Sequence, residues 1–138
     1  MTRTDRIERE IHIEAPVAKV WTLVTRPGWW IGDGDPSVHT FTEHADHVVV
    51  HDPTYGDFPI HPAGSDEPHY VAFRSPWDTE GETLVEFFLT AAGDGTHLRV
   101  VESGFAALKL TEAERDEAFE GNTKGWEAQL GHAKRMSE

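Results

Sequence analysis

A single carboxylate, Glu102, stands in an otherwise apolar strand pattern. Residues 98–102 read Leu-Arg-Val-Val-Glu, and side chains alternate along a strand, so Glu102 shares a face with Leu98 and Val100. Arg99 belongs to the opposite face and is expected to point to water. A carboxylate inside an apolar pocket can anchor a polar group of a ligand, or act as a general acid or base. Glu102 is therefore the candidate catalytic residue of this sequence.

Two structural explanations of Glu102 stay open beside the functional one. Arg74 is the expected partner in an ion pair, although Glu86 competes for the same guanidinium group. A β-bulge would instead shift the strand by one residue and turn Glu102 toward solvent. The sequence does not choose between these explanations and a polar anchor in a pocket.

Asn122 lies on the apolar stripe of the predicted C-terminal helix, one turn after Phe119 and one turn before Trp126. A buried amide group must find hydrogen-bond partners. Asn122 is thus expected either to bind a ligand directly or to satisfy a carbonyl group of a neighbouring strand, and both options stay open.

Aromatic side chains are expected on the surfaces that the helix and the sheet present to each other. Each aromatic residue buries roughly 150–250 Å², so about half of them are needed simply as core. The predicted cavity lining consists of Trp30, Phe73, Phe87, Phe119 and Trp126. Together with Arg74, Glu102 and Asn122, these residues form the predicted ligand-binding set.

The nine histidines prompt a search for a metal site. Zinc requires three or four ligands within tetrahedral reach. His47 and His51 share a strand face only if one regular strand holds both, and neither His-x-His nor His-Glu-x-x-His spacing is present. We therefore predict no metal site and no cofactor, and interpret the histidines as surface residues.

The candidate residues must be positioned by a sheet and its helices. Alternation predicts a first strand at residues 7–14, followed by a short helix at 17–24 that begins behind Pro16. Residues 29–31 are interpreted as a second short helical turn. Residues 58–62 contain two prolines and are predicted to form an edge strand at best. The other predicted strands lie at 38–41, 47–51, 70–74, 83–90 and 96–104.

A capping box at Thr111-Glu-Ala-Glu114 opens the C-terminal helix, which is expected to run for roughly 25 residues. The helix carries Gly121, Gly125 and Gly131, although each interior glycine costs roughly 1 kcal/mol relative to alanine. These glycines predict that another backbone or a ligand approaches the helix closely, or that they leave space for a cavity.

Composition narrows the classes of function. The formal net charge is −13 and no basic patch is present, which argues against nucleic acid and against an anionic membrane surface as partners. The sequence has no cysteine and no apolar run of the length that a transmembrane helix needs. We expect one domain over residues 1–138 and a cytoplasmic location.

Several short motifs follow one another in order along nearly the whole chain. They are Ile11-His-Ile-Glu-Ala-Pro-Val-Ala-Lys-Val-Trp21, Trp29-Trp30, Asp52-Pro-Thr-Tyr-Gly-Asp-Phe-Pro59, Arg74, Val85-Glu-Phe87, Gly95-Thr96, Val101-Glu-Ser-Gly-Phe105 and Gly125-Trp126. This order resembles the helix-grip superfamily of START and Bet v 1-like proteins (SRPBCC), and within it the group related to the C-terminal domain of the activator of Hsp90 ATPase. The resemblance implies an α+β fold, in which a curved antiparallel sheet of about six or seven strands grips a long C-terminal helix across a cavity. Two short helices are expected after the first strand.

The resemblance leaves several functions open, because members of the superfamily include carriers of lipids and hormones, polyketide cyclases, hydrolase-like proteins and co-chaperone modules. The leading hypothesis is non-catalytic binding of a small hydrophobic molecule in the cavity. One alternative is a cyclase- or hydrolase-like enzyme that uses Glu102 with Arg74 or Tyr70. Another is a protein-interaction or stress-response module related to the Hsp90 co-chaperone domain. A homodimer through residues 58–62 or through the last helix is a further option.

Overall fold

The computed structural model describes residues 6–32, 35–76 and 81–138. The strands are β1 (Arg6–Ile13), β2 (Thr40–Glu43), β3 (Val48–Asp52), β4 (Gly56–Asp66), β5 (Tyr70–Pro76), β6 (Glu82–Ala92) and β7 (Gly95–Ser103). The α-helices are α1 (Val17–Val24) and α2 (Glu112–Ser137), and two single 3-10 turns are η1 (Pro36–Val38) and η2 (Phe105–Ala107).

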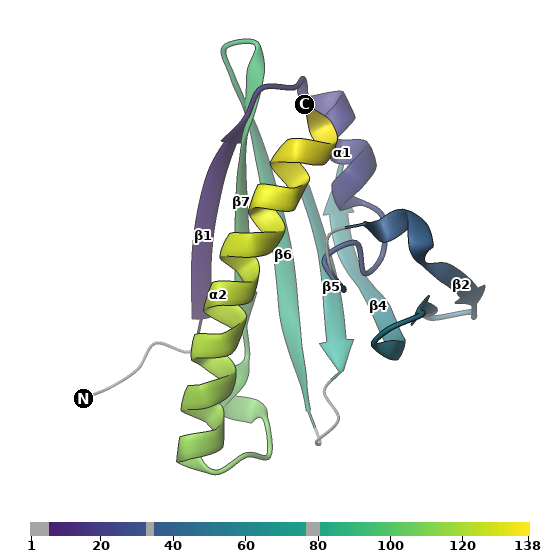
Figure 1. The fold of residues 1–138 in the computed structure, drawn as a ribbon, viewed down its shortest axis with the longest axis vertical. Helices are drawn as coiled ribbons and strands as arrows, with labels where there is room; N and C mark the ends of the chain where they lie inside the picture. The colour runs from purple at the N-terminus through teal and green to yellow at the C-terminus, as the bar shows by residue number, and fades with distance from the viewer. Residues whose placement is uncertain (1–5, 33–34, 77–80) are drawn as a thin grey trace.

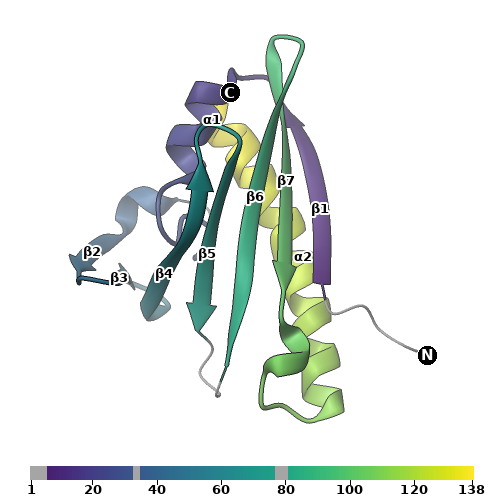
Figure 2. The same ribbon diagram turned by 180° about the vertical axis from the view of Figure 1, so that it is seen from behind.

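The strands form one antiparallel sheet in the order β1-β7-β6-β5-β4-β3-β2. Each strand from β2 to β7 pairs with its neighbour in the sequence, and β1 pairs with β7. The long helix α2 runs across one face of this sheet, with α1 beside its C-terminal end (Figure 1). Figure 2 shows the molecule from behind, with the strands in front of α2. This arrangement confirms the predicted α+β helix-grip fold.

The core lies between α2 and the face of the sheet that it covers. Every second residue is buried from Thr83 to Leu89 in β6 and from Thr96 to Val100 in β7, as alternation requires. Trp126, Leu130 and Ala133 of α2 pack onto this face at helical spacing. None of the helices in the described ranges is long and apolar enough to cross a membrane.

The segment after α1 differs from the prediction of two short helices. Between β1 and β2, α1 is the only α-helix in the described residues, and Trp29, Trp30 and Ile31 lie in a turn. Gly28 has a φ of +68° and follows Pro27, so the backbone cannot continue a helix here. A Cβ atom on Gly28 would also lie 2.9 Å from Cγ2 of Val50. The glycine therefore lets this turn pack closely against β3.

The strand β4 is an interior strand, whereas its prolines predict an edge strand at best. It pairs with β3 on one side and with β5 on the other. The register shifts between Pro62 and Gly64, so a β-bulge lies at the second proline. In the described ladders β3 pairs with residues 56–60 and β5 with residues 61–66, so a dimer through residues 58–62 stays a prediction. A dimer through the last helix stays a prediction.

The predicted capping box of α2 is present. The Thr111 side chain accepts a hydrogen bond from the Glu114 N–H at 3.1 Å, and the Glu114 side chain accepts one from the Thr111 N–H at 2.9 Å. The N–H of Thr111 first, and then its hydroxyl group, lower the pKa of the Glu114 carboxyl group, and the two hydrogen bonds of the box complete the cap. They satisfy two of the N–H groups that every helix leaves unpaired at its start.

We expect Thr111→Ala to lower the free energy of unfolding by about 1 kcal/mol, because the cap acceptor is lost. Urea unfolding followed by circular dichroism measures the change. Thr111→Ser is the matched control, since serine keeps the hydroxyl group and should retain most of the stability. Equal losses in the two variants would show that the hydroxyl group is not responsible.

Candidate ligand-binding pocket

A pocket of about 300 Å³ opens between α2, the sheet and the turn that follows α1. Its lining residues are Trp30, Ile31, Phe58, Ser75, Pro76, Glu102, Asn122, Gly125, Trp126 and Gln129. Aromatic and aliphatic side chains make much of the wall, and a few polar groups converge on it. This composition is typical of sites for small molecules.

Glu102 is buried in the wall of this pocket, with 4% of its surface exposed. Its Oε1 atom accepts hydrogen bonds from Nε1 of Trp126 at 2.8 Å and from Nδ2 of Asn122 at 2.9 Å. Its Oε2 atom accepts one from the hydroxyl group of Thr83 at 2.6 Å. An ionised carboxylate only accepts hydrogen bonds, and all three partners donate. The surroundings thus suit a carboxylate held by neutral donors.

The register of β7 is regular at Glu102. This residue pairs with Ile7 of β1 and with Val85 of β6, inside continuous ladders on both sides. A bulge therefore does not turn Glu102 outward, and its side chain reaches α2 as strand alternation predicts.

The predicted ion pair between Glu102 and Arg74 is wrong. The Arg74 side chain is 52% exposed, and its Nη1 atom lies 3.8 Å from Oε1 of Glu82. Arg74 follows Phe73 directly in β5, and neighbouring residues of a strand point to opposite faces. Because Phe73 faces the core, Arg74 must face away from the pocket.

Asn122 lines the pocket and connects α2 to the sheet. One of the two expected options is that Asn122 donates to a backbone carbonyl group of a strand. Its amide group instead donates to the side chain of Glu102. Direct contact between Asn122 and a ligand stays a prediction.

The five predicted aromatic residues separate into three positions. Trp30 and Trp126 line the pocket, with ring centroids 5.9 Å apart. Phe87 and Phe73 are buried behind them, each with its ring centroid 5.5 Å from that of Trp30. Phe119 does not line this pocket and packs on Phe105 at 5.5 Å. Seven residues of helix, or about 10 Å, separate it from Trp126.

Six lining residues are missing from the predicted set: Ile31, Phe58, Ser75, Pro76, Gly125 and Gln129. Two of them carry a signal in the sequence. Ser75 lies two residues after Phe73 and therefore on the same face of β5. Gln129 lies three residues after Trp126 and therefore on nearly the same face of α2.

The helix glycines have open space rather than a close neighbour. A Cβ atom built on Gly121 or on Gly125 meets no heavy atom of the described residues within 4 Å. The expected close approach of another backbone is therefore wrong for these two positions. The alternative of space for a cavity fits Gly125, which borders the pocket.

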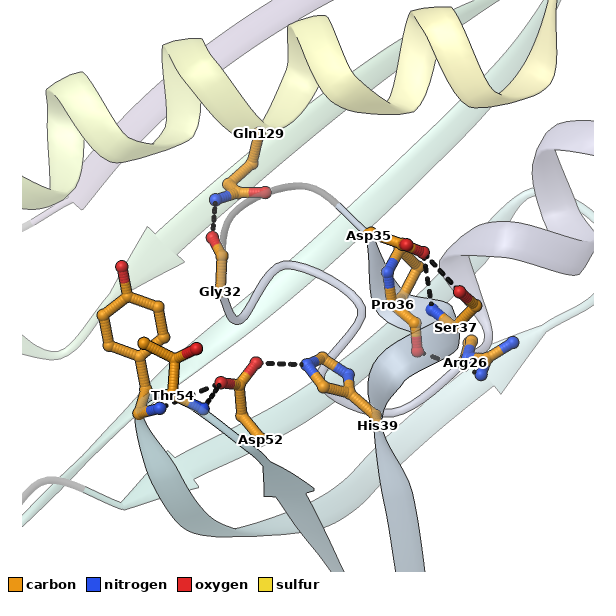
Figure 3. A network of polar contacts seen from close by, with 10 residues as sticks. Arg26, Gly32, Asp35, Pro36, Ser37, His39, Asp52, Thr54 and Gln129 are labelled. Carbon is orange, nitrogen blue, oxygen red and sulfur yellow. Dashed lines mark hydrogen bonds and ion pairs between the residues drawn. The ribbon is translucent and has the colours of Figure 1, made fainter.

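A network of polar contacts holds the turn that contains Trp30 and Gly32 in place (Figure 3). Nε2 of Gln129 donates to the carbonyl oxygen of Gly32 at 3.1 Å. Asp52 and His39, both buried, form a hydrogen bond of 2.9 Å beside this glycine. A Cβ atom on Gly32 would lie 2.6 Å from Oδ2 of Asp52, so the turn and the pair are in close contact.

The other oxygen of Asp52, Oδ1, accepts the backbone N–H groups of Thr54 at 2.8 Å and Tyr55 at 2.9 Å. The hydrogen bond from Tyr55 is the largest of several contributions that lower the pKa of Asp52, and burial opposes them. In the sequence Asp52 is only the first residue of the motif Asp52-Pro-Thr-Tyr-Gly-Asp-Phe-Pro59, which does not connect it to His39.

Neither a protein-family model nor a curated protein matches the sequence. Solved structures do. BH1534 of Bacillus halodurans has a TM-score of 0.71 at 24% identity, with 100% of both chains covered. MLL2253 of Mesorhizobium loti has a TM-score of 0.72 at 18% identity, with 94% of both covered. The Aha1 dimer of Colwellia psychrerythraea has a TM-score of 0.71 at 15% identity, covering 98% of this chain and 97% of that one. These similarities are similarities of fold. One of the similar structures is an Aha1 protein, and the sequence motifs resemble the same group.

Proposed function

We propose that this chain binds a small, largely apolar molecule in the pocket between α2 and the sheet, without catalysing a reaction on it. The observation that carries this proposal is Glu102, a buried carboxylate in the wall of a pocket of about 300 Å³ that combines aromatic, aliphatic and polar residues. Burying a charged group is costly unless its hydrogen bonds are satisfied. Three donors satisfy Glu102, so it can be kept at this position as an anchor.

The lining suggests the chemistry of the ligand. Trp30, Trp126 and Phe58 offer aromatic surfaces, which suit a flat apolar body. Glu102 supplies acceptor oxygens and negative charge, so the complementary group is a hydroxyl or an amine. A protonated amine would gain further from the neighbouring indole rings. We therefore expect an aromatic or alicyclic molecule with one hydrogen-bond donor.

The geometry favours binding over the enzyme alternative. That alternative needs a second positioned group beside Glu102, and Arg74 and Tyr70 are its candidates. Arg74 pairs with Glu82. The Tyr70 hydroxyl donates to Glu86 at 2.6 Å, and burial together with this carboxylate raises the pKa of Tyr70 to about 12. Neither residue lines the pocket.

A pair of matched helix variants tests the proposal. Gly125 borders the pocket and Gly121 does not, although both are exposed positions of α2 with open space at Cβ. We expect Gly125→Leu to fill the pocket and weaken ligand binding by about tenfold or more, whereas Gly121→Leu leaves it unchanged. Both substitutions should raise stability by roughly 0.5–1 kcal/mol, because leucine is the better helix former.

Tryptophan fluorescence provides the readout, since Trp30 and Trp126 line the pocket. A panel of apolar amines and alcohols is titrated into the wild-type chain and both variants, and native mass spectrometry detects any molecule that copurifies. A saturable response that Gly125→Leu alone removes supports the proposal. The proposal fails if no compound gives a saturable response, or if the two variants respond alike.

A further inference from the structure

Three imidazole rings stack in a row, two from the turn between β2 and β3 and one from β4. The ring centroids of His44 and His47 are 4.5 Å apart, and those of His47 and His61 are 4.9 Å apart. The sheet register places them there. Val48 pairs with Ile60, so His47 and His61 are the next residues opposite each other. The backbone N–H of His44 donates to the carbonyl oxygen of His47 at 2.9 Å and extends the row.

Asp46 brings a carboxylate to the same row. Its Oδ1 atom lies 2.6 Å from Nδ1 of His47. One potential ligand atom from each of Asp46, His47 and His61 lies within 4.8 Å of the other two. In a tetrahedral zinc site the bonds are roughly 2.0–2.2 Å long, which places ligand atoms about 3.3–3.5 Å apart. Side-chain rotation can bring these groups that close, because Asp46 is 76% exposed and lies in a turn.

We propose that Asp46, His47 and His61 bind a divalent transition-metal ion such as Zn²⁺, with His44 stacked beside them. Imidazole nitrogens suit zinc, nickel and copper, whereas magnesium and calcium prefer a shell of oxygen ligands. A bound ion would link the turn between β2 and β3 to the neighbouring strand β4. The prediction of no metal site rested on spacing in the sequence, whereas these ligands come together through the pairing of β3 with β4.

The site is separate from the ligand pocket. Ile60 is buried against the core, so the adjacent His61 points to the opposite face of β4. Arg74 is the next residue across the sheet from His61, and its positive charge is partly balanced by Glu82 at 3.8 Å. The chain carries a net charge of −13, which favours cation binding in general and makes a control essential.

Zinc titration of the full chain without an affinity tag, in competition with a chromogenic chelator, tests the proposal. We expect the wild type to bind about one equivalent with saturation, and His61→Ala to weaken binding by about tenfold or more. His97→Ala is the matched control, since the His97 ring lies 3.1 Å from a Glu10 carboxylate in β1 and offers the same pair of donors. This control should bind zinc like the wild type.

Two results would overturn the proposal: no saturable zinc binding by the wild type, or undiminished binding by His61→Ala. Circular dichroism and thermal unfolding without metal establish that each variant is folded. His61→Gln serves as a second variant with the same expected loss, because glutamine keeps a polar side chain of similar length but has no imidazole nitrogen. The pocket is not involved, so failure here leaves the proposed ligand binding untouched.

Discussion

Glu102→Ala is expected to lower the free energy of unfolding by about 3 kcal/mol. The substitution removes the acceptor of three hydrogen bonds, and a buried donor without a partner costs about 1–3 kcal/mol. The indole N–H of Trp126 is buried and therefore carries most of this cost. Asn122 is half-buried at the pocket wall, where water can replace the lost oxygen. Urea unfolding at neutral pH measures the loss.

Glu102→Gln is the matched variant for this prediction. The amide oxygen of glutamine can accept from Trp126 and Asn122, and the Thr83 hydroxyl can rotate to accept from the amide N–H. We expect a loss below about 1 kcal/mol, since Trp126 and Asn122 keep an acceptor and Thr83 keeps a hydrogen bond to residue 102. Similar losses in the alanine and glutamine variants would instead show that the negative charge, rather than the hydrogen bonds, stabilises the fold.

The glutamine variant also separates stability from recognition. If the ligand presents an amine to Glu102, affinity should fall in Glu102→Gln while the fold is preserved. A hydroxyl ligand needs only an acceptor, which glutamine still provides. The same variant thus distinguishes the two donor classes that the pocket favours.

The fold was predictable where a local pattern coincides with the packing. Alternation in residues 96–104 and the capping box at Thr111 identify β7 and the start of α2, because each signal is contained in a few consecutive residues. The strand β4 was misjudged because proline is a local signal, whereas an interior position depends on both neighbouring strands. The bulge between Pro62 and Gly64 is a tertiary adjustment that no local pattern shows.

The site was predictable to the extent that periodicity orders side chains on a face. Strand alternation places Glu102 on the inner face of the sheet, and helical spacing places Asn122 and Trp126 on the inner face of α2. In the structure Asn122 and Trp126 both donate hydrogen bonds to the Glu102 carboxylate. The predicted set also contained the adjacent residues Phe73 and Arg74. Neighbouring side chains of a strand point to opposite faces of the sheet. Because the Phe73 ring is buried on the inner face, the Arg74 guanidinium group lies on the outer face and cannot reach the cavity.

Contacts between strands lie beyond this kind of prediction. His39 and Asp52 are thirteen residues apart and meet because β2 pairs with β3: Thr40 lies opposite His51, so His39 and Asp52 are the next residues opposite each other. The row formed by His44 and His47 of the turn between β2 and β3 and His61 of β4 depends on register in the same way. A one-residue slip in either pairing would place the rings on opposite faces.

Asp52→Ala is expected to lower the midpoint of thermal unfolding by more than about 5 °C. The carboxylate accepts from His39 and from the backbone N–H groups of Thr54 and Tyr55, and alanine leaves these donors without their acceptor. Nδ1 of His39 already has no partner among the described residues, so the imidazole ring has no second hydrogen bond to rely on. Differential scanning calorimetry measures the midpoint.

Asp52→Asn isolates the contribution of the charge through its pH dependence. The pKa of Asp52 in the folded chain is lowered from the usual value near 3.8, first by the N–H of Tyr55. A lowered pKa means that the carboxylate stabilises the fold above the pKa of the unfolded chain, and that this stabilisation disappears as the pH falls through the folded pKa. The stability difference between wild type and Asp52→Asn should therefore shrink as the pH falls below about 4. An undiminished difference at pH 3 would contradict this assignment.

The Asp52 variants should also alter the ligand pocket, although Asp52 does not line it. Gly32 packs against Asp52, and the same turn carries Trp30 and Ile31 into the pocket wall. Loss of the pair removes the support of the turn on the side of β3, while Gln129 still holds it from α2. We expect Asp52→Ala to increase acrylamide quenching of tryptophan fluorescence and to weaken ligand binding, with Gly121→Leu as the variant that changes neither. Unchanged quenching would show that α2 and the aromatic contacts of Trp30 hold the turn without the buried pair.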